Sequence, residues 1–63
     1  METFADKFKE LRKKSGLTQQ ALADITLIPR RTIQDWEKGK MEPPEWCQRL
    51  VLAELERLAQ NNE

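Results

Sequence analysis

Hydrophobic residues recur at helical spacing through most of this chain, and polar turns separate them into four segments. Phe4, Phe8 and Leu11 fall on one helical face in the first segment, and Leu22 with Ala23 does so in the second. No segment alternates as a strand does. The pattern predicts an all-α fold, a small four- or five-helix bundle in one domain over residues 1–63. The expected helices cover residues 4–15, 19–26, 29–38 and 45–60.

Residues that favour helix ends stand at the expected boundaries. Thr3 can cap the first helix, with Asp6 three residues later as in a capping box, and Thr18 can cap the second. Gly16 and Gly39 follow the first and third helices, where a left-handed residue ends a helix. These local signals predict where the helices begin and end.

The third segment is short and has two distinct sides. Ile33 and Trp36 lie three residues apart on its inner face, whereas Arg30 and Arg31 stand at its start. Only a tight turn fits between this segment and the one before it. A short helix that is packed from behind and carries donors at its exposed N-terminal end has what recognition in the DNA major groove requires.

The last segment is too apolar for a helix with a single buried face. Trp46, Leu50 and Ala53 mark one stripe, while Cys47, Val51, Leu55 and Leu58 mark a second. Either the bundle surrounds this helix on two sides, or one stripe meets a second copy of the chain. Because so small a domain buries little surface, we predict a homodimer with Val51, Leu55 and Leu58 at its two-fold contact.

The composition excludes several classes of function. The 63 residues include no His and one Cys, Cys47, so one chain cannot form a zinc site, a disulfide or a Cys–His nucleophile. A chain this short has little room for an enclosed active site, and we expect no enzyme activity, cofactor, metal or small-molecule substrate. No apolar run approaches the roughly 20 residues of a membrane span, so we expect a cytoplasmic protein without membrane contact.

The charges are unevenly distributed although they cancel overall. Residues 7–40 hold nine bases against four acids, a net charge of +5. Residues 1–6 carry a net −2 and residues 41–63 a net −3. A basic body with acidic ends is compatible with a nucleic-acid partner in spite of the zero net charge.

From about Phe8 to Glu45 the sequence resembles the helix-turn-helix domain of the phage repressor and Cro (XRE-like) family. No single residue carries the resemblance, which rests on the joint spacing of several pieces. They are Leu11-Arg12, Gly16-Leu17-Thr18-Gln19, Leu22-Ala23, Ile28, Ile33, Trp36-Glu37 and Gly39.

The resemblance implies a role for each matching position. It places Arg30, Arg31, Gln34 and Asp35 on the recognition helix, where the family contacts base edges. It assigns phosphate contacts to Gln19, Lys38 and Lys40, with Gln19 also bracing that helix. It implies a buried ion pair between Arg12 and Glu37, which makes Arg12 structural rather than DNA-binding.

The sequence departs from the family pattern in the turn between the two helices. Leu27 stands where the family has a left-handed Gly, and Thr26 stands where it prefers a large aliphatic residue. Pro29 replaces the usual Ser or Thr cap. Because a left-handed Leu is costly, either Leu27 keeps that strained conformation or the turn rewinds so that Leu27 enters the core, and we favour the second alternative.

These observations favour a function in sequence-specific binding of double-stranded DNA, as a small transcriptional regulator that acts as a repressor. A symmetric dimer would set two reading helices about one DNA turn, ~34 Å, apart on an inverted repeat. The alternative is a protein-interaction module or antitoxin on the same scaffold, which the zero net charge, Asp35 and the apolar last helix would suit.

Overall fold

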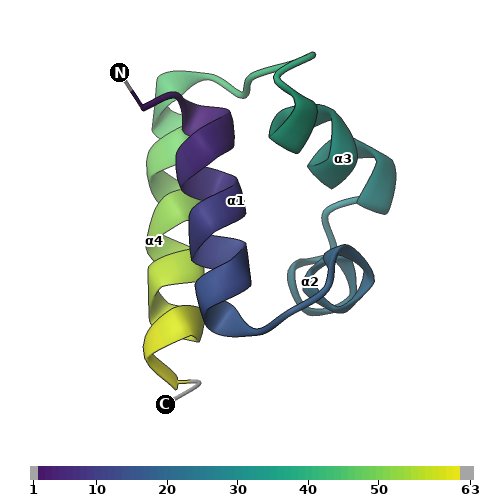
Figure 1. Ribbon diagram of the computed structural model, residues 1–63. Coiled ribbons are helices and arrows are strands. Elements are labelled where there is room, and N and C mark those ends of the chain that lie inside the picture. The colour runs from purple at the N-terminus through teal and green to yellow at the C-terminus, as the bar shows by residue number, and fades with distance from the viewer. Residues whose placement is uncertain (1, 62–63) are drawn as a thin grey trace.

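The structure, a computed structural model, describes residues 2–61. Within this range it has four helices and no strand: α1 (Phe4–Ser15), α2 (Gln19–Thr26), α3 (Arg30–Lys38) and α4 (Glu45–Asn61). The predicted boundaries differ from these by at most one residue. Pro29 is the N-cap of α3 rather than its first residue, and α4 extends to Asn61. As Figure 1 shows, α1 and α4 run side by side, while α2 and α3 lie together on the other side of α1.

The predicted caps are present. The Thr3 hydroxyl accepts a hydrogen bond from the Asp6 amide, and the Asp6 carboxylate accepts one from the Thr3 amide. The Thr18 hydroxyl accepts a hydrogen bond from the Ala21 amide at 3.0 Å. Gly16 adopts φ 76° and ends α1, because its amide can then donate to the carbonyl of Lys13. Each of these bonds joins residues three apart, so the local sequence is enough to fix these helix ends.

The core is organised around three aromatic rings contributed by α1 and α3. Trp36 packs edge-to-face with both Phe4 and Phe8, with ring centroids 5.8 and 5.7 Å apart. Such edge-to-face pairs contribute about 0.5–1.5 kcal/mol beyond the area that they bury. Leu22 of α2 and Ile33 of α3 are fully buried beside them. This cluster fixes α3 from behind.

The stripe of α4 formed by Cys47, Val51, Leu55 and Leu58, which we call the inner stripe, faces the body of the same chain. Leu55 is only 1% exposed, and Val51 and Leu58 are half-buried against the core. The prediction that Leu55 forms a dimer contact is therefore wrong, because α1 and the core already cover it within one chain. The stripe formed by Trp46, Leu50 and Ala53, which we call the outer stripe, is left uncovered, with Trp46 and Leu50 among the exposed large hydrophobic residues.

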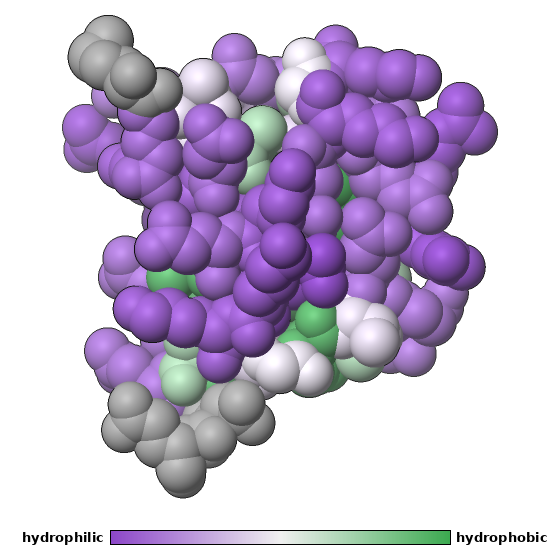
Figure 2. Space-filling model, in the orientation of Figure 1, coloured by the Kyte–Doolittle hydropathy of each residue, from purple (hydrophilic) through white to green (hydrophobic). Residues whose placement is uncertain are grey.

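The surface on the α1 side is mostly hydrophilic (Figure 2). The exposed side of α4 carries ion pairs within the helix, between Glu45 and Arg49 at 3.3 Å and between Glu54 and Arg57. The side-chain hydrogen bond from Arg57 holds the pKa of Glu54 below its usual value. The same bond raises the pKa of Arg57. Exposed pairs of this kind contribute little to stability.

Candidate nucleic-acid interface

The turn between α2 and α3 keeps a left-handed residue without glycine. Leu27 has φ 62°, its amide donates to the Ala23 carbonyl at 2.8 Å, and its side chain is 86% exposed. The expectation that Leu27 enters the core is therefore wrong. Thr26 explains why the turn does not rewind, since its hydroxyl donates to the Leu22 carbonyl at 2.8 Å and accepts the Ile28 amide at 3.3 Å. These bonds hold the turn in a form that puts Ile28, not Leu27, against the core.

The start of α3 is open and basic. Pro29 provides no side-chain cap, and Arg30 and Arg31 in the first turn are both exposed. The first amides of a helix have no partner within the helix, and the helix dipole adds positive character at this end. On the opposite side of the helix, Ile33 and Trp36 are buried. The exposed side of α3 is therefore a rigid surface that presents hydrogen-bond donors and positive charge.

The other two predicted base-reading residues are less accessible than the arginines. Gln34 is half-buried, and the Asp35 side chain is only 18% exposed. The Asp35 carboxylate lies 3.7 Å from Nε of Arg31, one turn earlier on the same helix. This ion pair limits where the Arg31 guanidinium can lie. We call Arg30, Arg31, Gln34 and Asp35 together the reading surface.

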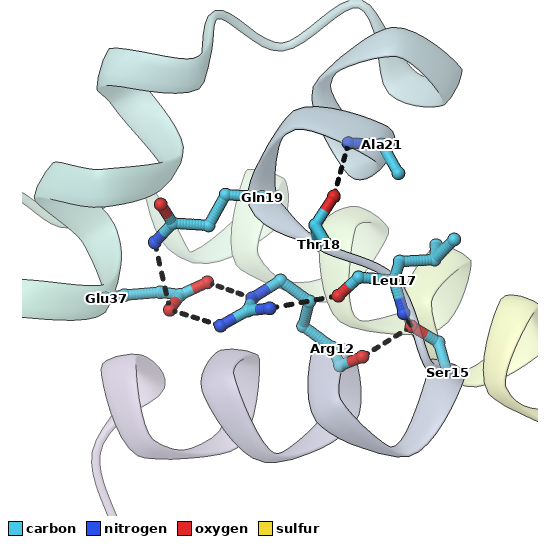
Figure 3. A network of polar contacts seen from close by, with 7 residues as sticks. All are labelled: Arg12, Ser15, Leu17, Thr18, Gln19, Ala21 and Glu37. Atoms are coloured by element: carbon cyan, nitrogen blue, oxygen red, sulfur yellow. Dashed lines mark hydrogen bonds and ion pairs between the residues drawn. The ribbon is translucent and has the colours of Figure 1, made fainter.

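A buried ion pair ties α3 to α1, as the resemblance implied (Figure 3). Nε and Nη2 of Arg12 donate to the two carboxylate oxygens of Glu37, at 2.6 and 3.1 Å. The Arg12 side chain is 16% exposed and that of Glu37 6%. Nη1 of Arg12 donates to the Leu17 carbonyl at 2.9 Å. The guanidinium therefore links α1, the loop that follows it and α3.

Gln19 connects the start of α2 to the same network. Its side-chain amide donates to Oε1 of Glu37 at 3.3 Å, which gives it the bracing role expected from the resemblance. Gln19 follows the capping residue Thr18, so it lies beside the free amides of the first turn of α2. Such a helix start favours a phosphate group. The phosphate contact of Gln19 itself remains a prediction.

The remaining predicted phosphate contacts follow α3. Lys38 is in its last turn and Lys40 lies just beyond Gly39, and both lysines are exposed. Gly39 has φ 76°, and the Lys40 amide donates to the Asp35 carbonyl at 3.0 Å. The chain therefore turns sharply here, and both lysines stay close to the C-terminal end of the reading surface.

Two structural features were missed by the sequence analysis. Ser15 is buried, and its hydroxyl donates to the Arg12 carbonyl at 2.6 Å while accepting the Leu17 amide at 3.3 Å. An apolar hollow of about 150 Å³ lies between α4 and the α2–α3 turn. The residues that line it include the buried Phe8, Leu22 and Leu55 together with Thr26, Ile28 and Leu50. The signal for the hollow was Thr26, a short residue where the family prefers a long aliphatic one.

The described residues offer no alternative site of a familiar chemical kind. They contain no cluster of three or more His, Cys, Asp or Glu side chains that could hold a metal ion. None of the described helices is long and apolar enough to span a membrane.

Comparison with known proteins agrees with this geometry. A family model described as helix-turn-helix matches residues 8–45, from the middle of α1 to the first residue of α4. No curated protein and no solved structure matches the chain significantly. The family match covers more than half of the 63 residues and includes all of α2, the turn and α3. The chain therefore belongs to the XRE-like family of DNA-binding helix-turn-helix domains.

Proposed function

We propose that this protein is a transcriptional repressor that binds a specific double-stranded DNA sequence through α3. The observation that carries the proposal is the exposed, basic start of α3 held rigidly from behind. Arg30 and Arg31 project from a helix whose other side is fixed by Trp36 and by the buried Glu37. A guanidinium carried by a helix that is held in place suits bidentate bonding to guanine O6 and N7, the commonest specific contact in the major groove.

The residues of the reading surface divide into different roles in this proposal. Arg30 and Arg31 contact bases directly. Asp35, held against Arg31 at 3.7 Å, restricts the orientation of that guanidinium and can accept a bond from cytosine N4. Gln34 is the fourth residue of the reading surface.

Affinity comes mainly from phosphates on either side of that surface. Gln19 and the free amides of α2 approach one backbone segment, and Lys38 with Lys40 approaches another. Residues 7–40 carry a net charge of +5, so this part of the chain attracts DNA although the whole chain is neutral.

The first experiment selects bound duplexes from a random pool and then measures affinity for the recovered sequence at several salt concentrations. A DNA-binding function predicts a recovered consensus and an affinity that falls steeply with salt, because counterions are released from the phosphates. No consensus together with no salt dependence would leave the protein-interaction or antitoxin function as the better explanation.

Arginine variants test the reading surface. Arg31→Ala is expected to cost about 1–3 kcal/mol of binding to the recovered half-site and to relax preference at one base pair. The matched control is Arg49→Ala on α4, because Arg49 is equally exposed and also pairs with a carboxylate four residues away. Lys40→Ala should weaken all duplexes alike and reduce the salt slope by about 0.9. If Arg30→Ala and Arg31→Ala both bind as tightly as the parent, α3 does not read the bases.

A further inference from the structure

The apolar hollow between α4 and the turn that joins α2 to α3 is a gap at the edge of the core. Its volume is about 150 Å³, and the buried side chains of Phe8, Leu22 and Leu55 are part of its lining. Thr26 also lines it but is too short to fill it, and Leu27 is 86% exposed and points elsewhere. The fold therefore leaves a space beside its core that no side chain of the turn occupies.

The lining of the hollow offers little that could bond to water. Among the described residues that line it, Thr26 alone carries a hydroxyl, which already donates to the Leu22 carbonyl and accepts the Ile28 amide. Glu54 brings the one charged side chain of that lining, and its carboxylate accepts hydrogen bonds from Arg57. A water molecule needs roughly two to four polar partners to be held in a cavity. An apolar group therefore displaces water from the hollow easily.

The hollow lies where two parts of the fold meet without packing closely. α4 packs on α1, α1 packs on α3 and α3 packs on α2, but α4 makes little direct contact with α2 or α3. Thr26 and Ile28 line the hollow from the turn, and Leu50 and Val51 line it from α4. A molecule in the hollow would contact both parts and would hold the turn that positions α3.

We propose that the hollow binds a small, uncharged, apolar molecule with an aromatic ring or a branched hydrocarbon chain. An apolar cavity of about 150 Å³ lined by Leu, Ile and Phe stays dry and takes up benzene, and this hollow is similar in size and lining. Sites for drug-sized ligands span roughly 300–1,000 Å³, so a larger molecule does not fit. A charged ligand is excluded, because it would lose its hydration without gaining a partner.

The ligand is expected to bind weakly because the hollow is open at one edge. Leu50 lines it and is 63% exposed, and the side chain of Glu54 is 42% exposed, so both lie at its mouth. Part of a bound ligand then stays in contact with water. We expect a dissociation constant of about 1 mM for benzene, which is well short of the tightest binding possible for so small a ligand.

Titration of the full chain with benzene, followed through the methyl resonances in NMR spectra, tests the proposal. The methyl groups of Ile28 and Val51 should shift to saturation with one common dissociation constant. Ile25 and Leu27 are exposed aliphatic residues outside the hollow, and their methyl groups should shift only weakly and in proportion to the benzene added. The melting temperature should also rise with benzene, because a ligand that binds only the folded state stabilises it.

Filling the hollow provides the decisive variant. Thr26→Leu should weaken benzene binding at least tenfold, because the longer side chain occupies the site. Thr32→Leu is the matched control, since Thr32 is a half-buried threonine of α3 outside the lining, and it should bind benzene within about twofold of the parent. Leu50→Ala removes a wall at the mouth without touching the buried core and should weaken binding about threefold. Circular dichroism verifies that each variant is folded.

Two outcomes overturn the proposal: shifts of Ile28 and Val51 that do not saturate up to the solubility of benzene, or saturable binding that Thr26→Leu leaves unchanged. The first would mean that Leu50 closes the hollow or that an apolar side chain of another protein fills it. The site is separate from the reading surface, so the proposal does not rest on the DNA-binding function. A chain that recovers no DNA consensus can still bind benzene, and the two failures are therefore distinguishable.

Discussion

Removing the buried carboxylate of Glu37 is the sharpest test of how this small fold is held together. The carboxylate accepts two bonds from Arg12 and one from the side chain of Gln19, and it is the only charged group described that neutralises the Arg12 guanidinium at close range. In Glu37→Ala the guanidinium keeps a single acceptor, the Leu17 carbonyl. An uncompensated charge remains buried, and breaking a buried pair in this way costs about 3–5 kcal/mol.

That cost is large for a chain of this size. At roughly 0.05–0.15 kcal/mol per residue, a 63-residue domain has about 3–9 kcal/mol of stability in total. Glu37→Ala should therefore lower the melting temperature by roughly 12 °C or more, because each kcal/mol shifts the midpoint of a domain this small by about 4–8 °C. A large part of the variant should be unfolded at 37 °C.

Thermal and urea unfolding followed by circular dichroism measure this effect. Glu10→Ala is the matched control, because Glu10 is an exposed helical glutamate, and its loss should change stability by no more than about 0.5 kcal/mol. Combining Glu37→Ala with Arg12→Met should cost clearly less than the sum of the two single changes, because the second substitution removes the stranded charge. A loss below about 1 kcal/mol for Glu37→Ala would refute the reasoning, since the pair would then behave as an exposed one.

The turn between α2 and α3 provides two further tests. Leu27→Gly should raise the free energy of unfolding by about 0.5–1 kcal/mol, because it relieves the strain of a left-handed Leu and removes a side chain that contacts mainly water. A lower melting temperature for this variant would show that the Leu27 side chain packs against the fold. Thr26→Leu should fill the apolar hollow and stabilise the fold by about 0.5–2 kcal/mol, whereas Thr26→Val loses the hydroxyl bonds without reaching into the hollow and should destabilise it by about 1 kcal/mol. If Thr26→Leu destabilises as much as Thr26→Val, the hydroxyl bonds outweigh the gain from filling the hollow.

The sequence alone determined the helices and their ends. Thr3 and Thr18 bond to amides three residues later, and Gly16 and Gly39 take left-handed conformations that end the helices before them. These interactions are local, so the residue types at fixed offsets are sufficient to predict them. The side of α3 that faces outward was also predictable, because Trp36 belongs to the only apolar face of that helix.

The network around Arg12 and Glu37 was predicted through the family resemblance rather than from local spacing. The two residues are 25 positions apart, and only the crossing of α1 and α3 brings them within 2.6 Å of each other. Nothing in the sequence near either residue sets that distance.

Only the tertiary structure decided the conformation of the turn and the orientation of α4. The left-handed conformation of Leu27 is unfavourable by itself. The hydrogen bonds of Thr26 and the burial of Ile28 against the core outweigh that cost, so Leu27 stays exposed. Both stripes of α4 are apolar, so periodicity identifies two faces without saying which one turns inward. The inner stripe turns inward because Leu55 packs against the core, and this orientation leaves Trp46 and Leu50 at the surface.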